Sequence, residues 1–185
     1  MSKDINTKYE GSSDENGIPN GEGILKTFHN NKISKIEKGL FSNGYLIEGS
    51  ETTYLENFIK KEIGKWRYDQ EKNFCDEFIS GDGQELYFKS EEDLNQNNFF
   101  GFVKGTFDDG TLTKGEVYNA FEIDYSDHKF VKRILVESKN TGKIFFENGD
   151  YYEGELFHDM PQGNGIMNFK NGEKKSGKWV NGNLE

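Results

Sequence analysis

The glycines of this chain recur at fixed spacings, and this repetition constrains the fold more than any other feature. Gly149 and Gly172 are 23 residues apart, and so are Gly154 and Gly177. A period of this length is typical of one supersecondary unit that stacks on copies of itself. An interior glycine costs a helix about 1 kcal/mol, so 22 glycines among 185 residues argue against a mainly helical chain. The pattern predicts an ordered array of β-units.

Weaker copies of the unit lie upstream. Residues 38–49 and 104–115 align without gaps and share the pattern K-G-x-F-x-[ND]-G-x-L-x-x-G. At the N-terminus, residues 9–11 read Tyr-Glu-Gly, as residues 152–154 do. The glycines that we assign to the repeat are Gly11, Gly21, Gly23, Gly39, Gly44, Gly49, Gly105, Gly110, Gly115, Gly149, Gly154, Gly163, Gly165, Gly172 and Gly177.

Each unit has the sequence pattern of a β-hairpin. Asn-Gly and Asp-Gly dipeptides, such as Asn43-Gly44, tolerate the positive φ of a tight hairpin turn. Aromatic and β-branched residues alternate roughly with polar ones on either side, as a half-buried strand requires. A glycine within a strand lets a neighbouring backbone or ring approach closely. We therefore expect the repeat aromatics to lie against glycines of the adjacent hairpin.

Residues 53–63 allow two interpretations. Their apolar residues follow helical spacing, Thr53 and Glu56 fit a capping box, and Gly64 is a suitable end. The alternative is a long hairpin bent at Glu56-Asn57, because short apolar stretches do not separate helix from strand. The sequence thus predicts an all-β chain, with either a hairpin or one short inserted helix near residues 53–63.

The chain resembles MORN repeats, whose pattern is Y-x-G-x-W-x-x-G-x-x-x-G-x-G. The resemblance rests on Tyr152-Glu153-Gly154, Gly163-Asn164-Gly165, Asn171-Gly172 and Gly177-Lys178-Trp179. It implies an elongated, twisted antiparallel sheet of consecutive β-hairpins. It also implies the uses of that family, which are scaffolding, protein–protein contact, self-association and phospholipid contact.

The repeat organisation predicts one MORN-like domain over residues 1–185. Within it, residues 1–8 are expected to form a flexible N-terminal segment. The repeats are clearest over 9–28 and 140–185 and degenerate over 36–139. No part of the chain is left over for a separate catalytic domain.

Charge narrows the choice of partners. The chain has 33 acidic and 23 basic residues, a formal net charge of −10. Such a chain is repelled on average by nucleic acid and by anionic bilayers, so we expect no nucleic-acid partner and disfavour membrane contact. Cys75 is the single cysteine, and the N-terminus has no apolar signal-like segment, which favours a cytoplasmic protein.

No catalytic signature stands out. His29, His128 and His158 are far apart in the sequence and have no companion at metal-ligand spacing. We therefore expect a protein that is not an enzyme, with no catalytic residues, no metal and no cofactor.

Two features indicate a binding surface. Carboxylates are concentrated between Asp69 and Asp93, either as a solvated face or as a docking surface for a basic partner. The repeat aromatics either form the core between hairpins or act as anchors for a partner. The residues that we assign to partner binding are Tyr9, Tyr151, Tyr152, Trp179, Asp76, Glu77, Asp82 and Glu85.

These observations favour a non-catalytic interaction module or scaffold that uses an acidic, aromatic-bearing sheet face to bind another protein, one that is basic. One alternative is an inhibitor of the immunity or antitoxin kind, which occludes a basic enzyme. A second alternative is a phospholipid-associated scaffold. Self-association through a terminal hairpin, either the N-terminal one or Val180–Glu185, is a further expectation.

Overall fold

The computed structural model describes residues 5–69, 74–108, 110–118, 131–138, 140–157 and 160–185, with the backbone alone for 68–69, 74–78 and 131–133. Its elements are β1 (Ile5–Ser13), β2 (Pro19–His29), β3 (Lys32–Ser42), β4 (Tyr45–Tyr54), β5 (Ile59–Asp69), β6 (Phe74–Phe88), α1 (Glu91–Gln96), β7 (Gly101–Asp108), β8 (Thr111–Tyr118), β9 (Val131–Ser138), β10 (Thr141–Phe146), β11 (Tyr151–Phe157), β12 (Met160–Asn168), β13 (Lys174–Val180) and β14 (Asn183–Leu184).

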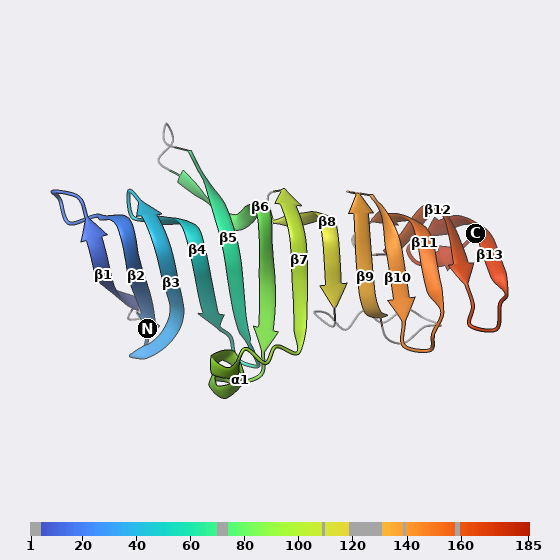
Figure 1. The fold of residues 1–185 in the computed structure, drawn as a ribbon, viewed down its shortest axis with the longest axis horizontal. Helices are drawn as coiled ribbons and strands as arrows, with labels where there is room; N and C mark the ends of the chain where they lie inside the picture. Colours follow the sequence, from blue (N-terminus) through green and yellow to red (C-terminus); the bar gives the residue numbers. More distant parts are fainter. Residues whose placement is uncertain (1–4, 70–73, 109, 119–130, 139, 158–159) are drawn as a thin grey trace. The chain divides into compact units, whose positions relative to one another are not determined.

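The strands follow one another in the sheet in the same order as in the chain, from β1 to β14 (Figure 1). Neighbouring strands run antiparallel, as in the pairs β1–β2 and β12–β13. Pairing of this kind needs only short connections, because successive antiparallel strands are joined by tight turns. The prediction of an all-β chain of consecutive hairpins is therefore confirmed.

The chain divides into two compact units. Unit 1 comprises Met1–Phe100 with Phe107–Thr111, and unit 2 comprises Gly101–Thr106 with Leu112–Glu185. Unit 1 contains β1 to β6 and α1, whereas β9 to β14 belong to unit 2. Strand β1 already begins at Ile5, inside the segment 1–8 that the sequence analysis separated from the repeats.

Seven of the repeat glycines, together with Gly64 and Gly142, lie directly opposite one another on adjacent strands. In unit 1 the row runs Gly11, Gly23, Gly39, Gly49 and Gly64, and in unit 2 it runs Gly142, Gly154, Gly165 and Gly177. We call each row a glycine ladder. A Cβ at Gly39 would lie 2.8 Å from the Gly49 Cα and would overlap the Glu48 carbonyl oxygen. The ladder glycines therefore allow backbones to approach too closely for any side chain.

Tyrosine rings lie across both ladders. A Cβ at Gly165 would overlap the Tyr152 ring, and a Cβ at Gly23 would overlap the Tyr9 ring. Each tyrosine hydroxyl donates to the carbonyl oxygen three residues later in its own strand, at 2.9 Å for Tyr152 and 2.8 Å for Tyr9. The expectation that repeat aromatics lie against glycines is confirmed, but Tyr9 of β1 lies against Gly23 of β2, which is the partner strand in the same hairpin and not part of an adjacent one.

A second aromatic residue closes each of these arrangements. The ring centroids of Tyr152 and Trp179 are 5.3 Å apart at 75°, and those of Tyr9 and Phe41 are 5.4 Å apart at 77°. Both are edge-on contacts, the geometry that aromatic pairs prefer. The Trp179 Nε1–H also donates to the Gly165 carbonyl oxygen at 3.1 Å.

The 23-residue period is also a period of turns. Phe146 N–H donates to the Asp150 carbonyl oxygen at 3.0 Å, and Phe169 N–H donates to that of Glu173 at 2.9 Å. Gly149 and Gly172 take φ values of +93° and +90° in these turns. A tight hairpin needs a left-handed residue at this position, which explains the glycine there.

Residues 53–63 form a hairpin, and the alternative of an inserted helix at this place is wrong. Tyr54 ends β4, Ile59 begins β5, and Leu55 N–H donates to the Phe58 carbonyl oxygen at 3.0 Å. Helical spacing was misleading because Leu55 and Phe58 lie in the turn, whereas Ile59 and Ile63 are an even number of residues apart on β5 and so share a strand face, with Ile59 buried.

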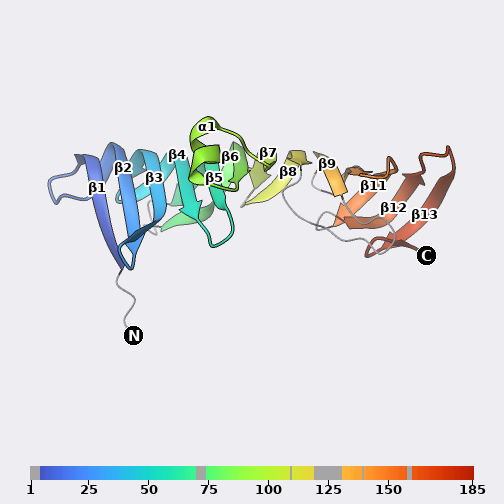
Figure 2. The same ribbon diagram turned by 90° about the horizontal axis from the view of Figure 1, so that it is seen from below.

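The helix that the structure does contain, α1, follows β6 directly. Ser90 caps it by accepting a hydrogen bond from Asp93 N–H at 3.1 Å, and Asn97 ends it in a left-handed conformation. Three acidic residues, Glu91 to Asp93, occupy its first turn, where the helix dipole favours negative charge. Figures 1 and 2 both show α1 beside β6.

Candidate interaction surface

Four glutamates of unit 1 lie side by side on one sheet face. They are Glu37, Glu51, Glu62 and Glu85, and each lies directly opposite the next on strands β3 to β6. Every one is two residues from a glycine at or beside the ladder. Residues i and i+2 of a strand share a face, so these side chains project on the ladder side of the sheet. We call these four residues the carboxylate row.

Two lysines contact the carboxylate row from the adjacent row of side chains. Lys35 Nζ is 3.3 Å from Glu37 Oε2 and 3.3 Å from Glu51 Oε2. Lys60 Nζ is 3.0 Å from Glu62 Oε2. Burial lowers the pKa of Lys35, but Glu51 and Glu37 outweigh burial, so the pKa lies above its usual value. Four carboxylates against two ammonium groups leave the surface acidic.

The carboxylate row is partly withdrawn from water. The Glu62 side chain is 5% exposed and that of Glu37 is 13% exposed. Burial raises the pKa of Glu62, and Glu85 and Glu51 raise it further against the opposing effect of Lys60. Burial likewise raises the pKa of Glu37, with Lys35 lowering it and Glu51 raising it. Desolvation disfavours charge, so the ionised row is held at a cost.

Aromatic residues adjoin the end of the row at β6. The Tyr87 hydroxyl donates to Glu85 Oε2 at 2.7 Å. Burial and the neighbouring Glu85 carboxylate raise the pKa of Tyr87 far above its usual value, so the phenol stays protonated. The Tyr87 ring lies 5.8 Å from the Phe58 ring and 6.4 Å from the Phe100 ring. This end of the row thus combines carboxylates with aromatic rings, and both kinds of group attract cationic side chains.

The acidic residues assigned from sequence have three different placements. Glu85 belongs to the carboxylate row, on β6. Asp82 is exposed on the same strand. The side chains of Asp76 and Glu77 lie outside the described residues.

The aromatic residues assigned from sequence are mainly internal. Tyr152 is 0% exposed and Trp179 is 5% exposed, which favours the role of core between hairpins. Tyr9 is half-buried over the ladder. Tyr151 is half-buried too, and its ring stacks on Phe145 with centroids 6.0 Å apart.

Three residues of the carboxylate row were missed by the sequence analysis. Glu37, Glu51 and Glu62 lie outside the acidic stretch 69–93, which drew attention by its density. A sharper signal was present: Glu-x-Gly at residues 37–39 and 62–64, and Gly-x-Glu at 49–51 and 83–85. Combined with a register set by glycines, that spacing predicts one continuous row.

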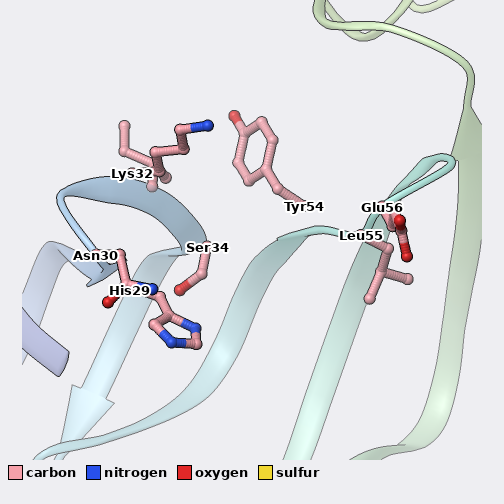
Figure 3. A pocket seen from close by; sticks show the side chains of 8 residues that line it. His29, Asn30, Lys32, Ser34, Tyr54, Leu55 and Glu56 are labelled. Carbon is pink, nitrogen blue, oxygen red and sulfur yellow. The ribbon is translucent and has the colours of Figure 1, made fainter. Parts of the chain in front are cut away.

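A separate pocket of about 500 Å³ lies between the β2–β3 and β4–β5 turns. In Figure 3 the Lys32 and Tyr54 side chains lie on one side of it, and Leu55 and Glu56 come from the second turn. Burial, and next the Glu91 carboxylate, raise the pKa of Tyr54. Besides the His29 imidazole, its charged side chains are one ammonium group, Lys32, and one carboxylate, Glu56. Its lining residues are His29, Asn30, Lys32, Ile33, Ser34, Tyr54, Leu55 and Glu56.

Within the part of the chain that the structure describes, no three His, Cys, Asp or Glu side chains are grouped so that they could hold a metal ion. Among those same residues, no helix has the length and apolar character needed to cross a bilayer.

Comparison with known proteins gives no family assignment. No family model matches the chain. No curated protein is significantly similar to it. Its function must therefore be argued from its own residues.

Proposed function

We propose that this chain is a non-catalytic protein-interaction module whose carboxylate row binds a basic segment of another protein. The observation that carries the proposal is the row itself, in which four glutamates face one another across adjacent strands. Like charges directly opposite each other destabilise a sheet. A binding role gives a reason for keeping them.

Unit 2 supports this argument, because it builds the same ladder without such charges. The corresponding positions on β9 to β12 are occupied by Ile134, Ile144, Tyr152 and Met167, all buried, and the position on β13 by the exposed Lys175, so no carboxylate stands there. The glycine ladder therefore does not need carboxylates beside it. Local choices that oppose stability are expected where a protein has a function to serve.

The physical mechanism is charge complementarity on a preformed sheet. Arginine or lysine side chains of a partner would add hydrogen bonds to those that the carboxylates already accept from the two lysines, Thr53 and Tyr87. The acidic net charge of −10 would also raise the rate of encounter with a basic protein. We also propose that the hairpin array is of the MORN type and that the protein is cytoplasmic. The register of the glycines supports the MORN-type array.

The test compares two variants with the same change in net charge. Glu37→Gln/Glu51→Gln alters the carboxylate row, whereas Glu22→Gln/Glu48→Gln alters exposed glutamates on the opposite sheet face. Binding of fluorescent lysine- and arginine-rich peptides would be measured by anisotropy at two salt concentrations. We expect the row variant to bind about tenfold more weakly and the matched control to change little.

Equal weakening of both variants would show that only net charge matters and would contradict a specific surface. Circular dichroism of each variant would confirm that the β-structure is retained. Binding of acidic peptides as tightly as basic ones would also exclude the proposed charge complementarity.

A further inference from the structure

Among the described residues, strand β1 is an open edge of the sheet. It is first in the strand order, and β2 is its paired neighbour within the described residues. Eight of its nine residues are exposed, Ile5 among them at 64%. Its pairing with β2 is regular from Ile5 to Gly11, and the strand contains no proline. A long, regular edge of this kind is a template for another strand.

The opposite end of the strand order differs. Strand β14 has two residues, Asn183 and Leu184, which pair with Val180 and Trp179. Very short edge strands are one way in which proteins prevent edge pairing. Of the two terminal hairpins considered for self-association, the N-terminal one therefore has the edge suited to it.

We propose that β1 pairs antiparallel with β1 of a second copy of this chain, with Tyr9 opposite Tyr9 of the second copy. Such a contact is isologous, so it closes at two chains and does not propagate into a fibre. Tyr9 is the midpoint of Ile5–Ser13, so this register alone opposes the strand along its full length. Full overlap gives the largest number of backbone hydrogen bonds across the new edge.

The charges of β1 select the same register. Lys8 and Glu10 are two residues apart, so they share one face of the sheet. With Tyr9 at the centre, Lys8 lies opposite Glu10 of the second copy, and Glu10 lies opposite Lys8 of the second copy. If the centre moved by one residue, Lys8 would face Lys8 or Glu10 would face Glu10. Opposite charges across strands stabilise a sheet and like charges destabilise it.

This contact is independent of the carboxylate row. The row lies on β3 to β6, and the pairing would use the outer edge of β1. Either can therefore fail without affecting the other.

The test is sedimentation equilibrium of the whole chain over a concentration series. We expect a monomer of 21.3 kDa in equilibrium with a species of twice that mass. Lys8→Glu alone and Glu10→Lys alone each place like charges opposite one another at both contacts. Each should weaken dimerisation about tenfold, since cross-strand charge pairs contribute about 0.2–1 kcal/mol each.

Two further measurements are specific to the register. The double exchange Lys8→Glu/Glu10→Lys restores both complementary pairs and should restore dimerisation. An equimolar mixture of the two single variants should form heterodimers about as tightly as the unaltered chain forms its dimer. Both residues are exposed, so the changes leave the folded core intact.

Three outcomes would overturn the proposal: a chain that stays monomeric at millimolar concentration, single variants that dimerise like the unaltered chain, or a double exchange that fails to restore association. The last two would show that any dimer uses another surface or another register.

Discussion

In unit 2 the side chains next to the glycine ladder on β8 to β12 are apolar, whereas in unit 1 the corresponding side chains on β3 to β6 are glutamates. The unit 2 row consists of Val117, Ile134, Ile144, Tyr152 and Met167, which are between 0% and 6% exposed. In each unit the row lies two residues along the strands from the ladder, so its side chains project from the sheet face on which a side chain at the ladder positions would lie. The ladder thus fixes a backbone that accepts either chemistry.

The difference shows how each unit obtains its core. The strands of unit 1 cross the ladder, with the carboxylate row on one side of the glycines. Apolar side chains are buried further along the strands, on the other side of the glycines, where Phe41, Leu46, Trp66 and Ile79 are 1% to 6% exposed. Unit 2 buries apolar side chains on both sides of its ladder, with Leu156 and Trp179 on the side away from Ile144 and Met167. Full burial of one such side chain contributes about 1.5–3 kcal/mol. Unit 1 forgoes that contribution along the carboxylate row.

Exchanging the chemistry of the two rows should produce the largest effect. Ile144→Glu places a carboxylate where Ile144 is 0% exposed, and we expect a loss of about 4 kcal/mol in unfolding free energy or failure to fold. The reverse change, Lys60→Met/Glu62→Leu, replaces both members of a largely buried ion pair and should alter stability by about 1 kcal/mol or less, because replacing such a pair by apolar groups is often neutral. Urea unfolding measures both. Equal costs would refute the contrast between the rows.

A ladder glycine should matter more than a turn glycine. Gly165→Ala would force a methyl group into the Tyr152 ring and should cost about 3 kcal/mol. At Gly172 an added Cβ meets nothing within 4 Å, and only the φ of +90° opposes it. Gly172→Ala should therefore cost about 1 kcal/mol. Thermal unfolding of the two variants measures the loss of stability in each. A smaller loss for Gly165→Ala than for Gly172→Ala would contradict the close packing of the Tyr152 ring on Gly165.

The carboxylate row should also give unit 1 a distinct pH dependence. The pKa of Glu62 is raised, first by burial, so the folded chain binds this proton more tightly than the unfolded chain. The contribution of Glu62 to unfolding free energy is then fully present below the usual carboxyl pKa and is lost as pH rises through the raised pKa. Compared with Glu62→Gln, the unaltered chain should gain stability as pH is lowered from neutrality. Urea unfolding at several pH values measures the difference, and a constant difference would contradict the raised pKa.

The smallest effect should come from the two tyrosine hydroxyls. Tyr152→Phe removes a hydrogen bond to the Glu155 carbonyl oxygen in a fully buried setting and should cost about 1 kcal/mol. Tyr9→Phe removes the equivalent bond to Ser12 at an exposed edge, where water can replace it, and should cost about 0.3 kcal/mol. Burial raises the pKa of Tyr152 to about 12, and the neighbouring Glu155 raises it as well. Ultraviolet titration would detect the ionisation of Tyr152. Urea unfolding measures the loss of stability in the two variants, and an equal loss for Tyr152→Phe and Tyr9→Phe would contradict the expected effect of burial on the hydrogen bond.

Much of the fold could be read from particular residues. The spacing of Gly149, Gly154, Gly172 and Gly177 predicted the hairpin units and their turns, because a positive φ disfavours a side chain. The close approach of rings to glycines was predicted too, whereas the pairing of glycine opposite glycine in the ladder was not. The helix α1 was missed, although Ser90 and Asp93 have the spacing of a cap. The candidate surface was predicted only at Glu85. Glu37, Glu51 and Glu62 are separated by 14 and 11 residues of sequence, and strand pairing alone brings them together.

The sequence by itself determined the hairpin units and the places where aromatic rings meet glycines, since both depend on contacts within a unit or with the next strand. Only the tertiary structure decided which face each charged residue occupies and which side chains are withdrawn from water. A charge pattern along the chain does not state its neighbours, whereas the register of antiparallel strands does, because it places each residue opposite one partner and sends alternate side chains to opposite faces.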